Sequence, residues 1–297
     1  MNAAFIVMRA RPLHPSERNQ DRIRTRFIKD ETPAEFVVFL MCMTRFVCFP
    51  ALLCVGLYFC AASAHGQSAD ALIAKGDPLD QKLEAAEALK FYLPALKQEP
   101  NDVALLNRIA RQYRHLMADA SDKNEKLRLG HLSLDYANKG AELAPNNAEA
   151  QLSPAISYGK MLPFMRSSDQ VDAAPKIKAG CERAIELDPD NDNAWHILGR
   201  WNRTIADIPG VKKMLAGVFF DKLPEASNEE AEKCLRKAIA LNPRRAIHYI
   251  ELGHIYVQMG RKEEARKYLE KGLSMPNQEK GDNEAKEVGR ELLAKLG

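Results

Sequence analysis

The chain has 297 residues, an apolar share of 46% and a formal net charge of +3. This length allows one or two domains, and this apolar share supports a hydrophobic core. The excess positive charge lies in the first 64 residues, because the remainder carries 35 basic and 35 acidic residues. A balanced chain has no general attraction for nucleic acid, so we predict no nucleic-acid partner.

The segment before residue 65 has the features of an export signal. Residues 46–64 contain no charged side chain, follow Arg45 and end in Ala62-Ser63-Ala64. A basic flank, an apolar stretch and a small-x-small end are typical of a secretory signal peptide. We therefore predict a signal peptide over residues 43–64 and export of the mature protein to the periplasm or the outside of the cell.

Two further expectations follow for this region. Residues 1–42 are predicted to be an upstream extension of the reading frame that is disordered or absent from the mature protein. The alternative to cleavage is a membrane anchor formed by residues 36–64, which are almost continuously apolar. In both cases we expect membrane contact only through this hydrophobic segment.

Only two cysteines lie beyond the leader. Cys181 and Cys234 each fall within a predicted helix, at a position where an apolar side chain packs. We predict two buried free thiols, with a disulfide as the alternative in an oxidising compartment.

Residues 65–79 are polar and interrupted by Gly and Pro, so they are predicted to form a linker. A repeat domain is predicted over residues 80–297. Its first clear helix precedes Pro100, and Pro94 inside that helix predicts a kink or an early end. The apolar spacing of four and three that indicates this helix is carried by Ala88, Tyr92 and Ala95.

Two near-copies of one pattern lie between residues 181 and 276. The first reads Ala-Ile-Glu-Leu-Asp-Pro over residues 184–189, followed by Trp195-x-x-Leu198-Gly199. The second reads Ala-Ile-Ala-Leu-Asn-Pro over residues 238–243, followed by Tyr249-x-x-Leu252-Gly253. Each copy is a helix that ends near a proline, a polar turn and a second helix whose Leu-Gly pair allows close contact. This is the pattern of the tetratricopeptide repeat (TPR).

The predicted fold is therefore all-α: a TPR-like solenoid of about four helical hairpins. The spacing between closing prolines exceeds the usual 34 residues in all but the last repeat, so the hairpins carry insertions. Residues 211–220 are predicted to form an extra inserted helix, and residues 282–296 a C-terminal capping helix with a polar outer face. Ser227 is expected to cap the helix that follows the insertion.

The order of these elements resembles one particular family. Residues 195–201 (Trp-His-Ile-Leu-Gly-Arg-Trp) precede a long insertion with Phe219-Phe220 and then Pro224-x-x-Ser227. This arrangement resembles the regulator of microtubule dynamics protein family. The resemblance implies TPR-like hairpins and, in eukaryotic members, association with microtubules and mitochondria. Tubulin is then an expected partner only if the protein is cytoplasmic, whereas the leader favours export.

Polar residues recur on the first helix of successive hairpins. These helices line the concave surface of a repeat stack, whereas the face with the Leu-Gly pair packs inward. The polar residues follow the packing positions Leu106, Trp195 and Tyr249 by one, five or eight positions. The residues predicted to bind a partner are Asn107, Arg111, Arg114, His196, Arg200, Arg203 and His254.

Arginine side chains bind carboxylates through two parallel hydrogen bonds. Our hypothesis is a basic groove that binds a protein partner through an acidic or carboxylate-terminated peptide segment. The alternative is that these arginines pair with Glu and Asp on neighbouring helices, as charges on solvated faces commonly do.

The sequence contains no motif of a known catalytic or metal site, such as His-Glu-x-x-His, Gly-x-Ser-x-Gly or Cys-x-x-Cys. His248 and His254 are six residues apart and so point to different sides of a helix. We predict a non-catalytic binding scaffold with no cofactor and no metal. An enzyme on a helical-repeat frame is the remaining alternative, and it would require a pocket with convergent titratable side chains.

Overall fold

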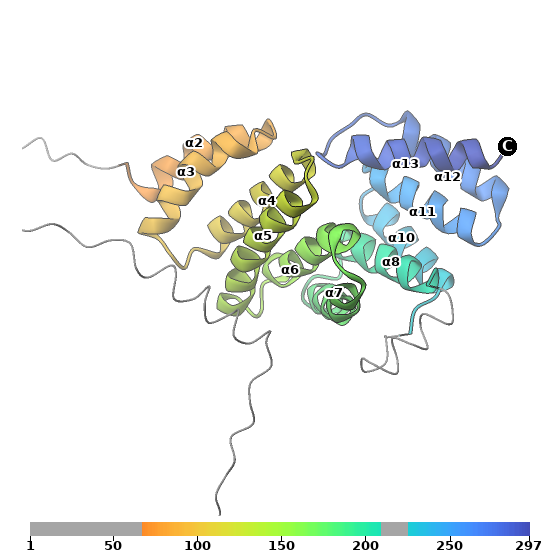
Figure 1. Cartoon of the computed structure of the whole chain (residues 1–297), viewed down its shortest axis with the longest axis horizontal. Helices are drawn as coiled ribbons and strands as arrows, with labels where there is room; N and C mark the ends of the chain where they lie inside the picture. Colours follow the sequence, from red (N-terminus) through yellow and green to blue (C-terminus); the bar gives the residue numbers. More distant parts are fainter. Residues whose placement is uncertain (1–66, 209–224) are drawn as a thin grey trace, which may run out of the picture. The chain divides into compact units, whose positions relative to one another are not determined.

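The computed structural model describes residues 67–208 and 225–297, and these residues form helices without any strand (Figure 1). The predicted upstream extension, the signal peptide or anchor and the inserted helix at 211–220 lie outside the described residues. The helices are α2 (Ala69–Gln81), α3 (Ala85–Gln98), α4 (Val103–Asp119), α5 (Lys123–Leu143), α6 (Ala148–Met161), the 3-10 helix η1 (Leu162–Phe164), α7 (Ser167–Leu187), α8 (Asp192–Ala206), α10 (Asn228–Leu241), α11 (Ala246–Gln258), α12 (Lys262–Ser274) and α13 (Asp282–Lys295).

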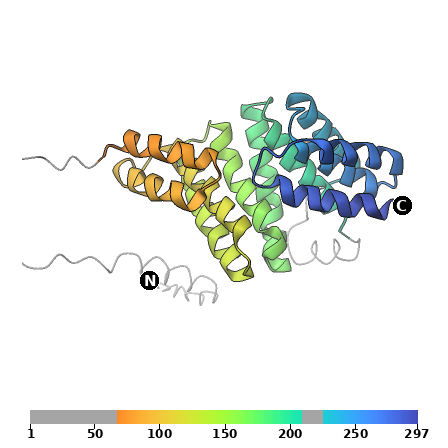
Figure 2. The ribbon, with the colours of Figure 1, turned by 90° about the horizontal axis from the view of Figure 1, so that it is seen from above.

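Consecutive helices pack as hairpins, and the hairpins stack along the domain (Figures 1 and 2). The pairs are α2–α3, α4–α5, α6–α7, α8–α10 and α11–α12, and α13 packs on α11 and α12. The predicted all-α, TPR-like solenoid is confirmed. The capping helix also lies where it was predicted, with Leu292 buried and Leu293 and Leu296 packed beside it against Ile250 and Leu269.

The prediction of a linker over residues 65–79 was wrong, because α2 begins at Ala69 and completes a further hairpin with α3. The Gly and Pro residues that suggested a linker have other roles. A Cβ atom at Gly76 would lie 2.5 Å from Cε1 of Tyr92, so this glycine makes room for a buried ring. Pro78 lies inside α2, which continues through it to Gln81.

The helices begin at the residues that the turn sequences indicate. Asp102, Asn191 and Ser227 each accept a hydrogen bond from the backbone N–H three residues later, at 3.1, 3.0 and 3.1 Å. The cap predicted at Ser227 is therefore confirmed. By contrast, α3 continues through Pro94 to Gln98, so the early end predicted there does not occur.

The Leu-Gly pairs allow the close helix contacts that the repeat requires. A Cβ atom at Gly199 would lie 1.7 Å from Cδ2 of Leu235, and one at Gly253 would lie 2.6 Å from Cγ of Leu269. Both leucines are fully buried. The second helix of each hairpin thus packs directly on the backbone of the first, at a distance that no larger residue permits.

Cys181 and Cys234 are free thiols buried in the main core cluster, together with Trp201, Leu235 and Tyr256. Burial raises the pKa of Cys181 well above its ordinary value and that of Cys234 to about 12. Both thiols are thereby kept in the protonated, unreactive form. None of the helices in the two described ranges is both long and apolar enough to span a bilayer.

We predict that Gly253→Ala destabilises the fold by about 1–3 kcal/mol. The added methyl group would overlap Leu269, which is enclosed and cannot move aside. The free energy of unfolding in urea measures the effect.

Gly159→Ala is the matched control, because a Cβ atom at Gly159 would meet nothing within 4 Å. This change should be neutral or stabilise α6 by up to about 1 kcal/mol, since alanine is the better helix former. Equal losses in the two variants would contradict the packing role of Gly253.

Candidate functional site

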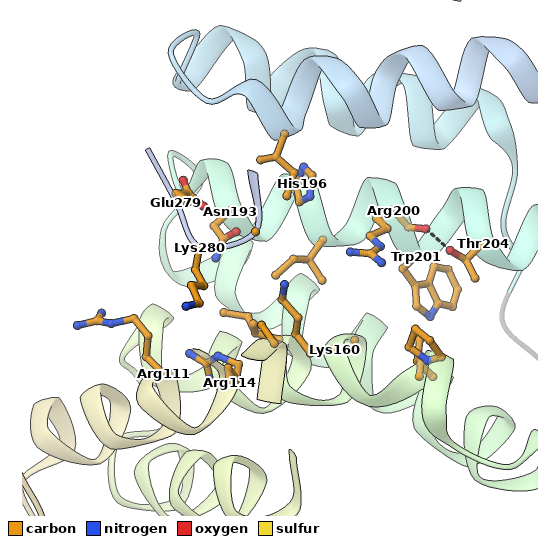
Figure 3. A pocket seen from close by; sticks show the side chains of 18 of the residues that line it. Arg111, Arg114, Lys160, Asn193, His196, Arg200, Trp201, Thr204, Glu279 and Lys280 are labelled. Atoms are coloured by element: carbon orange, nitrogen blue, oxygen red, sulfur yellow. Dashed lines mark hydrogen bonds between the residues drawn. The ribbon is translucent and has the colours of Figure 1, made fainter. Parts of the chain in front are cut away.

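A cavity of about 870 Å³ lies among the first helices of successive hairpins (Figure 3). Its walls come from α4, α6 and α8, with contributions from the end of α2, the start of α7 and the start of α11. The loop between α12 and α13, residues 278–281, also lines it. The cavity therefore occupies the surface that a TPR stack presents as concave.

The cavity collects most of the residues predicted from the sequence. Those that line it are Arg111, Arg114, His196, Arg200 and Arg203. Asn107 does not line it: this residue is 5% exposed and lies against α5, where a Cβ atom at Gly140 would be 3.4 Å from its Oδ1 atom. His254 does not line the cavity either.

Two of the arginines have carboxylate partners within the protein. Arg111 pairs with Asp80 at the end of α2, and Arg203 pairs with Glu251 on α11. Burial opposes the ionisation of Glu251, but the charge of Arg203 holds its pKa below the ordinary value. For these two arginines the alternative expectation was correct, because each pairs with a carboxylate on another helix. Both pairs join neighbouring hairpins.

Arg114 has a different environment. Its Nη1 atom donates to three serine hydroxyls, at 3.5 Å to Ser133, 3.3 Å to Ser153 and 3.1 Å to Ser157. Burial, together with the charge of Arg111, lowers the pKa of Arg114 to about 10. Within the described residues the partly buried Arg114 forms no ion pair with a carboxylate.

Lys160 and Arg200 extend this positive charge across the cavity. Figure 3 shows Lys160 between Arg114 and Arg200. Burial lowers the pKa of Lys160, as do the charges of Arg200 and Arg114. Neither Lys160 nor Arg200 forms an ion pair with a carboxylate in the described part of the chain. Three cations thus face one cavity without a direct ion pair in the described residues, although the charges of Glu284 and Glu279 act on Lys160 and that of Glu149 acts on Arg114.

The 278–281 loop closes one edge of the cavity. Glu279 accepts a hydrogen bond of 2.7 Å from Nη2 of Arg245, and Lys280 forms an ion pair of 2.7 Å with Asp119 at the end of α4. The loop is held in shape by Asp282, which accepts hydrogen bonds from the N–H groups of residues 278 and 279. The loop therefore links the last hairpin (α11–α12) to the second hairpin (α4–α5) across the cavity.

A histidine pair lies at the wall between α8 and α11. The Nδ1 atoms of His196 and His248 are 3.1 Å apart, and Nε2 of His248 lies 2.9 Å from Asp192. If Asp192 is ionised, His248 donates through Nε2 and accepts from His196 at Nδ1, so both rings are neutral. Burial lowers the pKa of both histidines, which agrees with this assignment. The pair therefore adds no charge to the cavity.

The sequence reasoning missed Lys160, Arg245 and Lys280. For Lys160 a signal exists, because it follows its closing proline Pro145 by the same fifteen residues that separate His115 from Pro100. Arg245 and Lys280 lie at a helix start and in a loop, outside the repeat pattern. In residues 67–208 and 225–297, no group of three or more His, Cys, Asp or Glu side chains is arranged to hold a metal ion.

Comparison with known proteins identifies a family that matches most of this chain. Residues 67–297 match the family of regulator of microtubule dynamics proteins 1-3. The chain belongs to this family. The resemblance inferred from the sequence is confirmed, and the matched range contains every residue that lines the cavity.

Regulator of microtubule dynamics protein 1 of Mus musculus is 28% identical over 240 residues, which cover 80% of this chain and 78% of the mouse protein. Regulator of microtubule dynamics protein 2 of Mus musculus is 24% identical over 76% of this chain and 56% of its own length. The crystal structure of a thermophilic TPR protein of Thermus thermophilus superposes with a TM-score of 0.56 and 17% identity, covering 76% of this chain and all of that one. The chain is thus a TPR-like helical scaffold related to the microtubule dynamics regulators.

We predict that His254→Gln reduces the loss of stability on acidification. Burial lowers the pKa of His254 to about 4, and the charge of Arg203 acts in the same direction. The unfolded chain binds this proton near pH 6.5, so the unfolded state holds more protons between pH 6.5 and 4. The stability that neutral His254 supports is complete above about pH 6.5 and decreases as the pH falls toward 4.

The measurement is the free energy of unfolding at pH 7.5 and pH 5. The wild-type chain should lose roughly 1–2 kcal/mol more than the His254→Gln variant over this interval. His131 is exposed, so His131→Gln serves as the control and should keep the wild-type dependence. An unaltered slope in the His254 variant would refute the assignment.

Proposed function

We propose that this chain is a non-catalytic scaffold that binds an acidic or carboxylate-terminated segment of a protein partner in the cavity. The observation that carries the proposal is the convergence of Arg114, Lys160 and Arg200 without a carboxylate partner in the described residues. A carboxylate is the protein group that complements such a set, because its oxygens accept charge-assisted hydrogen bonds from both guanidinium and ammonium groups.

The energetics favour an anionic ligand over a neutral one. A cation that is removed from water loses solvation, and the lowered pKa values of Arg114 and Lys160 reflect this cost. An entering carboxylate would recover part of that cost by ion pairing at low local dielectric. A neutral peptide offers carbonyl acceptors but no compensating charge, so it would bind less tightly.

We predict that neutralising the cations weakens the binding of acidic peptides. Arg114→Met and Lys160→Met should each reduce affinity about 10- to 100-fold, because a charge-assisted hydrogen bond in a protected site is worth about 1.5–3 kcal/mol. Arg200 is exposed and should contribute less, with a stronger dependence on salt. Fluorescence anisotropy with acidic peptides that end in a free carboxylate or in an amide measures these effects.

Arg183→Met is the matched control, since Arg183 does not line the cavity and pairs with Glu186 on the outer surface of α7. It removes the same charge and should leave affinity unchanged. Equal affinities for wild type and the Arg114 and Lys160 variants would exclude the cavity as the binding site. A preference for the free acid over the amide would favour recognition of a chain end over an internal acidic segment.

A second candidate function is regulation of microtubule dynamics. Family membership and the names of the relatives support it. Co-sedimentation of residues 67–297 with polymerised tubulin tests this function directly. Binding that disappears in the Arg114→Met or Lys160→Met variant would place tubulin in the cavity, whereas binding that is insensitive to both changes would indicate another surface.

Export remains a prediction of the leader sequence. If residues 43–64 are a signal peptide, the mature chain should begin close to residue 65, after Ala62-Ser63-Ala64. Mass spectrometry of the protein from its native source checks this, and a peptide that spans residues 60–70 in the mature chain would contradict it. The result also separates the two candidate functions, because an exported protein does not meet cytoplasmic tubulin.

A further inference from the structure

We propose that Ser133, Ser153 and Ser157 are positioning residues that aim Arg114 into the cavity while leaving its charge uncompensated, so that the cavity selects an anion. The inference rests on the proposed function and names the device that gives it specificity. Its basis is the identity of the three groups that hold the guanidinium: all are neutral hydroxyls.

The three serines form a buried set on α5 and α6, in which the hydroxyls of Ser133 and Ser157 are bonded to each other. Ser133 and Ser157 are fully buried, and Ser153 is 2% exposed. Ser133 donates to the carbonyl oxygen of Ala110 at 2.9 Å, and the hydroxyls of Ser133 and Ser157 are 2.8 Å apart. Since each hydroxyl has a single proton, the bond to Ala110 leaves the lone pairs of Ser133 for its other neighbours. The set therefore presents fixed acceptors to Arg114.

All three contacts go to one nitrogen of Arg114. They join Nη1 to the hydroxyl oxygens, so Nη2 and Nε take no part in them. Arg114 also lines the cavity, where Lys160 and Arg200 are its charged neighbours. One nitrogen thus anchors the group, and the remaining N–H donors of the planar fork are free of the anchor and suited to a carboxylate.

The other arginines of the cavity show how a carboxylate partner differs from the neutral serine hydroxyls that hold Arg114. Arg111 and Arg203 line it too, but Asp80 and Glu251 hold them. A carboxylate anchor fixes an arginine equally well and neutralises it, which removes its attraction for a second anion. The serines fix Arg114 without that loss. A partly buried charge without an ion pair is unfavourable in the free protein, and a bound anion would offset this cost.

The inference requires stability and binding to change in opposite directions. Ser157→Asp places a carboxylate beside Arg114, so it should neutralise the guanidinium and leave the free protein as stable as wild type or more stable. The same variant should lose anion binding. A purely structural role for the serines would predict no such separation, because an anchor that holds the arginine would keep its function.

The experiment uses the full chain and two probes: sulfate, at constant ionic strength against chloride, and an acidic peptide with a free carboxyl end. Sulfate raises Tm in general by its exclusion from protein surfaces, so Arg114→Met gives the baseline response. Sulfate should raise the Tm of the wild type and of Ser157→Thr, which keeps a neutral hydroxyl, by more than this baseline. The Tm of Ser157→Asp should rise no more than the baseline, and peptide affinity should fall at least 10-fold in Arg114→Met and Ser157→Asp. Ser153→Asp offers the same carboxylate from a neighbouring position and replaces Ser157→Asp if that variant does not fold.

A folded aspartate variant that keeps the wild-type sulfate response would overturn the inference. A wild type that responds to sulfate through Arg114 but binds no acidic peptide would support the role of the serines and remove the proposed function. A wild type that responds to neither probe would overturn both.

Discussion

The structure depends on the burial of one helix directly against the backbone of the next. No hairpin in this chain can cover its own apolar face, so each must stack on a neighbour. Gly199 and Gly253 set the distance inside a hairpin, because the side chains of Leu235 and Leu269 occupy the space that a Cβ atom would need. This spacing brings the first helices of successive hairpins side by side. The cavity follows from this arrangement. The apolar sides of those helices are buried in the packing between helices, so their polar sides face the cavity.

The charges in the cavity divide into two kinds. Arg111 and Arg203 join hairpins through Asp80 and Glu251, and the Glu279–Arg245 and Lys280–Asp119 contacts extend the same principle to the closing loop. These pairs fix the walls. Arg114, Lys160 and Arg200 have no such partners in the described residues, so they add positive potential without adding a link between hairpins. Ion-paired cations and cations without an ion pair therefore lie within one surface, and only their partners distinguish them.

The sequence predicted the architecture because helix period, closing prolines and Leu-Gly pairs are local features that repeat. It also predicted which side of α4 and α8 carries the arginines, since their register is counted from the packing positions Leu106 and Trp195. It could not predict the partners, because Asp80 and Glu251 lie on other helices and their distances follow from stacking. Asn107 and His196 share a register position, yet Gly140 opposite Asn107 lets that side chain pack against α5. Lys160 escaped notice because Pro154 obscured the repeat in α6, a helix that in fact continues through the proline.

Membership of the regulator of microtubule dynamics family establishes the scaffold, and the cavity narrows what the scaffold can recognise. A fold that only needed rigidity would place a carboxylate beside Arg114 or an apolar residue in place of this arginine, since either change leaves no unpaired charge there. This chain places three hydroxyls there, on two different helices, and those of Ser133 and Ser157 also bond to backbone carbonyls and to each other. Such an arrangement keeps the arginine fixed and charged at the expense of stability. Under the function proposed above, a ligand that supplies negative charge would offset this loss.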